Sequence, residues 1–135
     1  RRRLDQLLGG VSGKTVAVWG LTYKPGTDTL RRSSSVELCK WLLEQGAVVQ
    51  AHDPAVKNLP DEYKDVKLCP SALEAVYKAD ALIVATEWPD YREVNMRKVI
   101  SQMKTPLVLD ANRFLAKNVE GFNEIKYVAV GKSVK

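Results

Sequence analysis

Short apolar segments alternate with longer amphipathic segments along the chain, and this alternation is typical of an α/β fold. The apolar segments are rich in β-branched side chains, as are strands buried on both faces of a parallel sheet. Six segments are therefore expected to form strands, at residues 15–20, 48–53, 66–69, 81–86, 106–110 and 126–131.

Helix signals fill the intervals between these strands. Residues 36–45 carry apolar side chains at helical spacing, with Ser33 to Ser35 before them as N-cap candidates and Gly46 as the expected stop. Ser71 and Glu74 form the S-x-x-E pattern of a capping box. Further helices are expected over residues 71–79 and from about residue 93 to 103.

Strands that alternate with helices imply right-handed crossovers and a three-layer α/β sandwich. We expect a doubly wound, Rossmann-like and mainly parallel sheet of five to six strands. In such sheets ligands bind beyond the carboxyl ends of the strands. The candidate binding loops are therefore residues 20–34, 53–60, 86–92 and 110–115.

Length and composition fit one globular domain of 135 residues, without an apolar run of the roughly 18 residues that a membrane span needs. The first methionine is Met96, and the opening residues lack a signal peptide. We therefore expect a piece of a longer chain, with residues 1–13 as the end of a linker or connecting helix and 14–135 as the domain.

The two cysteines and the single histidine do not form a metal-binding pattern. Cys39 and Cys69 lie 30 residues apart without C-x-x-C spacing. No metal site is expected, and both are interpreted as buried thiols of a cytoplasmic protein.

The net charge of +5 suits either a small anionic ligand or a nucleic acid. The basic residues are scattered, and no basic strand rich in aromatic side chains is present. A nucleic-acid-binding module is therefore the least favoured interpretation, and we expect no nucleic-acid partner.

The loop after the first strand carries the strongest local chemistry. Gly20 permits a tight turn, and three serines open a helix whose free N–H groups favour an anion. Lys24 could place a charge on a phosphate and Tyr23 could pack on a flat ring. Alternatively, Lys24 is a solvated lysine and Tyr23 fills the core. The three-glycine dinucleotide fingerprint is absent.

Asp53 ends the second strand, where a dinucleotide-binding fold places a carboxylate on a ribose. It could equally cap a turn or neutralise Arg31 or Arg32. A small NAD-binding domain is therefore an alternative function, weakened by the missing fingerprint. His52 is interpreted as a strand residue rather than a catalytic base.

Two further loops hold candidate ligand-binding residues. Trp88 either lines the ligand cleft or covers the end of the sheet. Arg113 follows a strand end and could hold a carboxylate or phosphate with two hydrogen bonds. Its alternative role is an ion pair with Asp110 or Asp28.

Taken in order, "VAVWGLTYKPGTDTLRRSSSVEL", "GAVVQAHDP", "ADALIVATEWPDY", "LVLDANRF" and "YVAVGK" resemble the C-terminal, UDP-binding domain of the UDP-glucose/GDP-mannose dehydrogenase family. The resemblance covers nearly the whole chain from about Lys14. It implies a domain that binds a UDP-sugar.

The resemblance also implies roles for particular residues. Tyr23 and Lys24 match the family's aromatic-lysine pair, with the lysine near the phosphates or sugar. Arg31 matches the arginine after a Thr-Asp pair, here Thr27 and Asp28, although Thr29 replaces the family's usual second acid. The family's Asp-Gly-Arg-Asn stretch corresponds to residues 110–113, so its sugar-contacting arginine is displaced. The expected substrate-binding residues are Tyr23, Lys24, Arg31, Trp88, Asn112 and Arg113.

For the parent enzyme, the resemblance implies NAD-dependent oxidation of the sugar C6 alcohol to a uronic acid in two steps. NAD and the catalytic cysteine would then belong to a missing N-terminal part, and neither Cys39 nor Cys69 is given that role. This chain alone is expected to hold no cofactor and to be inactive. The parent is expected to form a homo-oligomer, whereas the isolated chain is compatible with a monomer. The identity of the sugar is not readable from these residues.

Overall fold

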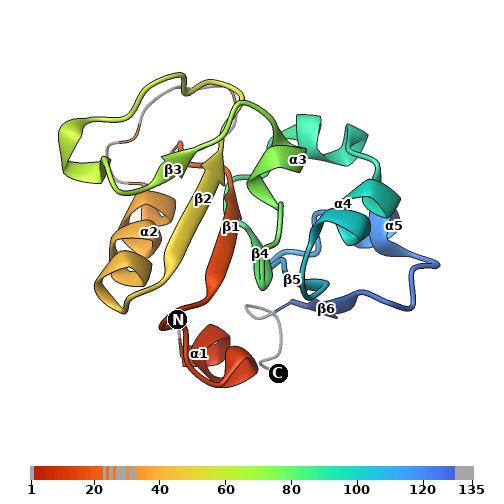
Figure 1. The fold of residues 1–135 in the computed structure, drawn as a ribbon. Helices are drawn as coiled ribbons and strands as arrows, with labels where there is room; N and C mark the ends of the chain where they lie inside the picture. Colours follow the sequence, from red (N-terminus) through yellow and green to blue (C-terminus); the bar gives the residue numbers. More distant parts are fainter. Residues whose placement is uncertain (1, 23, 25, 27–29, 31–32, 130–135) are drawn as a thin grey trace.

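A computed structural model describes residues 2–22, 24, 26, 30 and 33–129. Its centre is a six-stranded sheet with the order β3-β2-β1-β4-β5-β6 (Figure 1), and every neighbouring pair is parallel. The strands are β1 (Thr15–Trp19), β2 (Val48–His52), β3 (Lys67–Leu68), β4 (Ala81–Val84), β5 (Leu107–Leu109) and β6 (Lys126–Val128). The expected doubly wound, Rossmann-like fold is confirmed, with each strand within its predicted segment.

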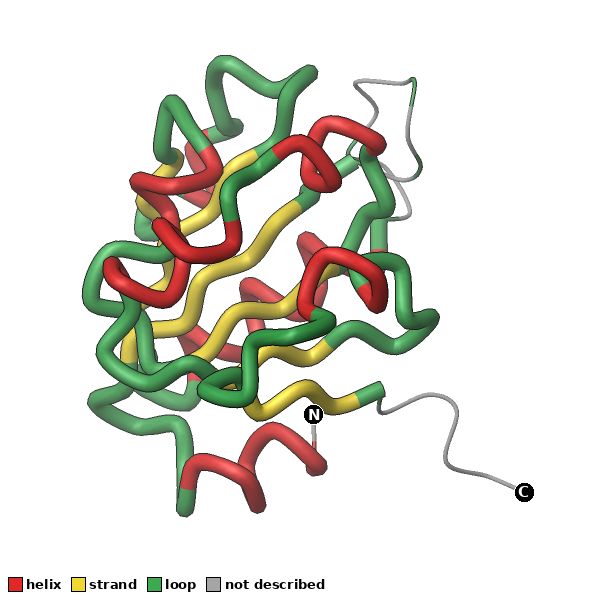
Figure 2. Tube along the Cα trace, turned by 90° about the vertical axis from the view of Figure 1, so that its right-hand side faces the viewer, coloured by secondary structure: helices red, strands yellow, loops and turns green. Residues whose placement is uncertain are grey.

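Helices flank the sheet on both faces, as Figure 2 shows. The helices are α1 (Arg2–Leu8), α2 (Ser34–Glu44), α3 (Ala72–Ala75), α4 (Met96–Gln102) and α5 (Ala116–Val119), with short 3₁₀ turns η1 (Asp61–Tyr63) and η2 (Pro89–Glu93). Leu4 of α1 and Leu42 of α2 belong to the core on one face. Ala75 of α3 and Val99 of α4 belong to the core on the other.

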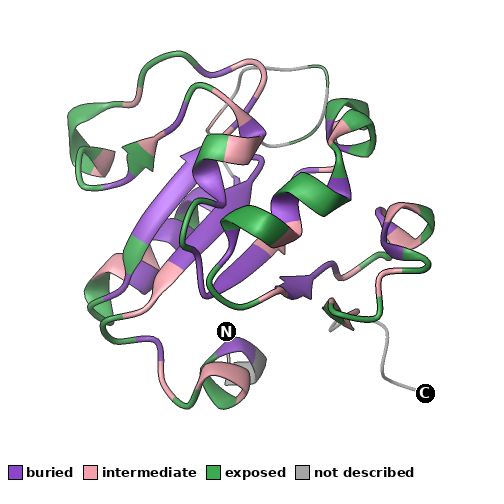
Figure 3. Cartoon of the chain, turned by 45° about the vertical axis from the view of Figure 1, so that its right-hand side comes forward, coloured by how far each residue is buried: buried purple, intermediate pink, exposed green. Residues whose placement is uncertain are grey.

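The central strands β1, β4 and β5 are almost wholly buried, the edge strands β3 and β6 are more exposed, and the outer helix faces are exposed (Figure 3). Val16 and Val18 of β1 point into one core, whereas Ala17 and Trp19 point into the other, as the alternation along a strand requires. The whole of β1 is therefore packed between two apolar layers. This rigid central strand fixes the position of the loop that follows it.

Helix boundaries differ from the expected ones for local reasons. Ser33 is the N-cap of α2, and its Oγ accepts from Val36 N. The helix α3 is shorter than the expected 71–79, and Lys78 after it has a positive φ of 58°. The helix α4 begins after Asn95, whose side chain caps it, rather than at about residue 93.

The first 13 residues, expected to be a linker or connecting helix, contain α1 and pack on the domain. Leu4 and Val11 are each only 2% exposed. No helix in the described part of the chain is long and apolar enough to cross a membrane.

Candidate functional site

The order of the strands places the site at the carboxyl edge of the sheet. The strands β1 and β4 are neighbours, so the chain reverses direction across the sheet between them. A crevice beyond this switch point is where ligands bind in open α/β sheets. The loops after β1, β4 and β5 therefore meet where the sequence predicted binding.

Gly20 lies at this switch point in a conformation that other residues rarely adopt. Its φ is +100°, and a Cβ placed there would lie 2.3 Å from Thr86 Cβ. The amide of Gly20 donates to the His52 carbonyl over 2.8 Å. The loops after β1 and β4 thus touch directly, and only glycine fits between them.

The Asp53 carboxylate anchors the loop after β1. Its Oδ2 accepts hydrogen bonds from Leu21 N at 2.8 Å and from Thr22 N at 3.0 Å. Thr22 Oγ1 lies 3.0 Å from the same oxygen. Asp53 Oδ1 accepts from Ala55 N at 2.8 Å, so both carboxylate oxygens are used within the protein. Asp53 therefore caps the turns after β1 and β2, which is one of the three roles predicted for it.

This arrangement differs from a dinucleotide site in one respect that matters chemically. In a dinucleotide fold, amides after the first strand hold a pyrophosphate and the carboxylate after the second holds a ribose. Here the amides of Leu21 and Thr22 bond to the carboxylate of Asp53 instead. The two groups that would hold the dinucleotide are engaged with each other.

Trp88 joins the same network from the loop after β4. Its Nε1 lies 3.1 Å from Asp53 Oδ2 and 3.2 Å from Thr22 Oγ1. The ring is half-buried against the core that contains Trp19 and Tyr91. Trp88 thus covers the end of the sheet, as one of its two predicted roles required.

Lys24 lies two residues beyond Thr22 and is exposed. Thr22 Oγ1 is 3.3 Å from the Lys24 carbonyl oxygen, so the anchored part of the loop reaches the lysine backbone. Thr86 Oγ1 also donates to the Thr22 carbonyl over 2.9 Å. Tyr23 and Arg31, the other candidates in this loop, lie outside the described residues, as do Asp28 and Arg32.

The loop after β5 is held by a second buried carboxylate. Asp110 is 1% exposed, and it accepts from Phe114 N, Leu115 N and Tyr127 Oη at 3.0, 2.7 and 2.7 Å. Burial raises the pKa of Tyr127, and its bond to Asp110 adds to this effect. The tyrosine hydroxyl therefore remains a donor to Asp110.

Asn112 and Arg113 stand exposed on this anchored loop. The Asn112 Nδ2 donates to Glu87 Oε2 at 2.8 Å, which links the loops after β4 and β5. The Arg113 guanidinium lies over the Tyr127 ring at 5.3 Å, and its backbone has a positive φ of 57°. Arginine is unusual in this left-handed region, where asparagine is enriched.

Sequence reasoning did not single out the residues that connect the candidates. Thr22, Thr86 and Glu87 supply bonds between loops. The available signal was a polar side chain two or three residues past the end of a strand. Its partner lies on another strand, so the local pattern could not name the contact.

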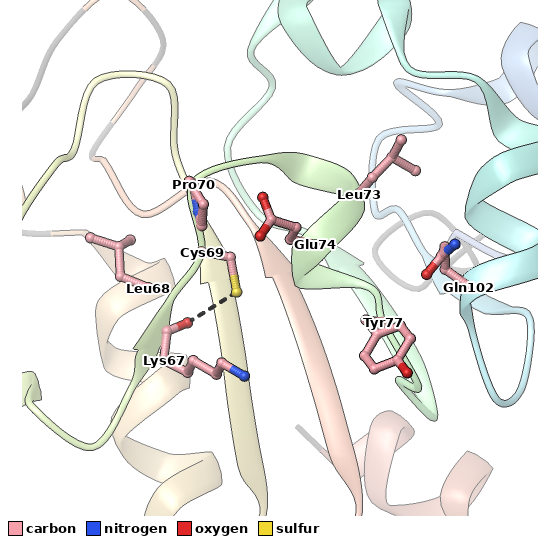
Figure 4. A pocket seen from close by; sticks show the side chains of 8 residues that line it. All are labelled: Lys67, Leu68, Cys69, Pro70, Leu73, Glu74, Tyr77 and Gln102. Carbon is pink, nitrogen blue, oxygen red and sulfur yellow. Dashed lines mark hydrogen bonds between the residues drawn. The ribbon is translucent and has the colours of Figure 1, made fainter.

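The cysteines are not poised as nucleophiles. Burial raises the pKa of Cys39 to about 12 and also raises that of Cys69. The Cys69 thiol is directed at the Lys67 carbonyl at 3.6 Å, as the dashed line in Figure 4 shows. Both thiols therefore stay protonated at neutral pH.

Two cavities adjoin edge strand β3. One of about 360 Å³ holds none of the predicted residues (Figure 4); it is lined by Lys67, Leu68, Cys69, Pro70, Leu73, Glu74, Tyr77 and Gln102. Another of about 190 Å³ lies at the end of β2, lined by His52, Asp53, Val56, Lys57, Leu68, Cys69 and Pro70. We place the candidate site at the loops after β1, β4 and β5 rather than in the larger of these two cavities. The exposed candidate residues Lys24, Asn112 and Arg113 belong to these loops.

The fold and these loops define a Rossmann-like α/β domain in which the backbone amides after β1 are bonded to the carboxylate after β2. Residues 17–117 match the sequence profile of the UDP binding domain of the UDP-glucose/GDP-mannose dehydrogenase family. The chain belongs to this family.

Known proteins resemble the chain over nearly all its length. It is 35% identical over 131 residues to a UDP-glucose 6-dehydrogenase of Rickettsia prowazekii (strain Madrid E), covering 93% of the chain and 30% of the relative. A UDP-glucose 6-dehydrogenase of Pseudomonas aeruginosa is 39% identical over 115 residues, 80% of the chain and 25% of the relative. The chain therefore spans less than a third of these relatives.

A solved structure shows the same architecture. The UDP-glucose dehydrogenase from the hyperthermophilic archaeon Pyrobaculum islandicum superimposes with a TM-score of 0.74 at 32% identity. The match covers 96% of this chain and 28% of that one.

Proposed function

We propose that this chain is the C-terminal, nucleotide-sugar-binding domain of an NAD-dependent UDP-sugar dehydrogenase. Lys24 and Arg113 support this function because both cationic side chains are exposed on anchored loops at the carboxyl edge. A diphosphate is an anion that such side chains recognise. The UDP part of the ligand follows from the family to which the chain belongs.

Within this site each residue has a distinct role. Lys24, with Tyr23 and Arg31 in the same loop, would hold the phosphates or sugar. Asn112 and Arg113 would contact the sugar from the loop after β5. Trp88 would line the site between the loop after β1 and the loop after β5.

The remainder of the parent supplies the chemistry. We infer that NAD and the cysteine nucleophile belong to the part of the relatives that this chain does not span, since Cys39 and Cys69 are both buried thiols here. The parent would oxidise the sugar C6 alcohol to a uronic acid. Two free thiols fit a reducing compartment, so we place the parent in the cytoplasm.

Substitution in the full-length parent tests the site. Hydrogen bonds to charged groups are worth about 1.5–3 kcal/mol, so Lys24→Ala and Arg113→Ala should each lower kcat/KM for the UDP-sugar by about tenfold or more. Exposed charges contribute little to stability, so the melting temperature should hardly change. Steady-state kinetics and thermal unfolding measure both quantities.

Matched controls are available on the outer face of α4. Arg97 lies over the Phe122 ring at 5.1 Å, much as Arg113 lies over Tyr127, and Lys98 is exposed like Lys24. Arg97→Ala and Lys98→Ala should leave the kinetics unchanged. Equal effects of site and control substitutions would refute the site.

A further inference from the structure

Asp53 is the most heavily used polar side chain in the candidate site. It is 3% exposed, and among the described residues five donors lie within hydrogen-bond distance of its two oxygens. These donors come from three loops: the loop after β1, the loop after β4 and the loop after β2 itself. One carboxylate therefore joins segments that are far apart in sequence.

The geometry around Asp53 Oδ2 is that of an anion site. Two consecutive amides, those of Leu21 and Thr22, follow a glycine with positive φ and converge on one oxygen at 2.8 and 3.0 Å. Consecutive backbone N–H groups in such turns bind phosphates in many proteins. Here an internal carboxylate fills the place of an external anion.

We propose that Asp53 is a positioning residue for the nucleotide sugar: its carboxylate holds Leu21 and Thr22 in the conformation from which the chain continues to Lys24. The connection is short, since the single Thr22 hydroxyl proton lies within reach of both Asp53 Oδ2, at 3.0 Å from Oγ1, and the Lys24 carbonyl oxygen, at 3.3 Å. The proposal rests on the proposed function, in which Lys24 binds the substrate.

The same carboxylate also holds Trp88. Trp88 Nε1 donates toward Asp53 Oδ2 at 3.1 Å, so the indole and the Lys24 loop share one anchor. An asparagine at position 53 has the same size but only one oxygen. Either orientation of its amide sets an NH₂ group against at least one backbone donor. Leu21 and Thr22 should then lose their fixed conformation while the sheet remains.

The test is a double-mutant cycle in the full-length parent with Asp53→Asn and Lys24→Ala. Asp53→Asn should raise KM for the UDP-sugar by about tenfold, the size of effect expected for one charged hydrogen bond. KM for NAD should stay unchanged. In the Lys24→Ala background the same substitution should add less than about threefold, because residues that act through one another are not additive.

Asp80→Asn is the matched control. Asp80 is also buried, at 7% exposure, and its Oδ2 accepts from Thr15 N at 2.9 Å, but it lies at the amino edge of the sheet. Its substitution should lower the melting temperature without changing KM for the UDP-sugar. If Asp53→Asn does not fold, Thr22→Val removes only the hydroxyl that bridges Asp53 and Lys24, and it should raise the same KM.

The possible results distinguish the positioning role of Asp53 from the proposed function. If Lys24→Ala raises KM but Asp53→Asn and Thr22→Val do not, the positioning role is overturned and the proposed function stands. If the effects of Asp53→Asn and Lys24→Ala simply multiply, Asp53 does not act through Lys24. If Lys24→Ala leaves KM unchanged, the proposed site fails and the positioning role fails with it.

Discussion

Single residues decide how tightly the loops at the carboxyl edge can approach. Gly20 combines a positive φ of 100° with a distance of 2.3 Å between an added Cβ and Thr86 Cβ. Both features exclude a side chain. The sequence identified Gly20 as a turn residue, but the approach to Thr86 depends on the pairing of β1 with β4.

Substitution of Gly20 should therefore be far more costly than that of an ordinary left-handed glycine. Gly20→Ala should lower the free energy of unfolding by about 2–5 kcal/mol, the sum of backbone strain and overpacking. Gly121, with φ +82° and no atom within 4 Å of an added Cβ, is the control. Gly121→Ala should cost only about 1–2 kcal/mol, for strain alone. Urea unfolding measures both, and equal losses would contradict the contact with Thr86.

His52 provides a pH-dependent signal because it is the chain's single histidine. Its Nδ1 lies 3.1 Å from Tyr91 Oη, and burial lowers its pKa below the ordinary 6.5 despite the opposing charge of Asp53. The unfolded state therefore binds the proton more tightly than the folded state. The stabilisation is complete above the unfolded pKa and is lost as pH falls below about 6.5.

The measurement is the free energy of unfolding from about pH 7.5 down to about pH 5.5, above the range where most carboxylates titrate. The wild-type chain should lose stability over this interval, and His52→Gln should lose less. Parallel curves for the two proteins would show that His52 has the same pKa in both states.

At the scale of elements, the start of α2 is tied to the end of β1. Ser33 Oγ donates to the Leu21 carbonyl at 2.6 Å, and Ser35 Oγ donates to the Gly20 carbonyl. Ser33 also caps the helix through Val36 N. These hydrogen bonds therefore fix the start of α2 against residues 20 and 21, at the beginning of the loop after β1.

The three consecutive serines offer an internal comparison. Ser33→Ala should lower the free energy of unfolding by about 1–2 kcal/mol, because it removes a helix cap and a buried bond to the loop. Ser34 is exposed, and Ser34→Ala should change stability by less than about 0.5 kcal/mol. Chemical unfolding of both variants measures the two changes in the free energy of unfolding. A loss at Ser34 as large as that at Ser33 would be inconsistent with the capping role.

Elements with local signals were predictable, and those set by distant contacts were not. The Ser71 cap is present, since Ser71 Oγ accepts from Glu74 N at 3.1 Å. In a standard capping box the glutamate carboxylate accepts from the backbone N–H of the N-cap residue. Here the Glu74 carboxylate instead accepts from the Ser71 hydroxyl. The four-residue helix α5 has no side-chain cap among the described residues, and no helix was expected there.

At the scale of the whole molecule, alternation of segments predicted the fold class, whereas the site depends on contacts between strands. Asp53 is 31 residues from Thr22 and 35 from Trp88 in sequence. Its position after β2 suggested a ribose contact, a turn cap or a partner for Arg31 or Arg32. Only the strand order brings its carboxylate to the amides of Leu21 and Thr22, so the sequence alone left these roles open.

The choice of ligand tests the central claim most directly, and titration calorimetry of this chain measures it. UDP and UDP-glucose should each bind with a Kd of about 1 mM, as expected for half of a shared site, which corresponds to a binding free energy of about 4 kcal/mol. Lys24→Ala and Arg113→Ala should abolish this heat. NAD should give none, because the amides of Leu21 and Thr22 are already bonded to Asp53. Binding of NAD tighter than that of UDP would contradict the account.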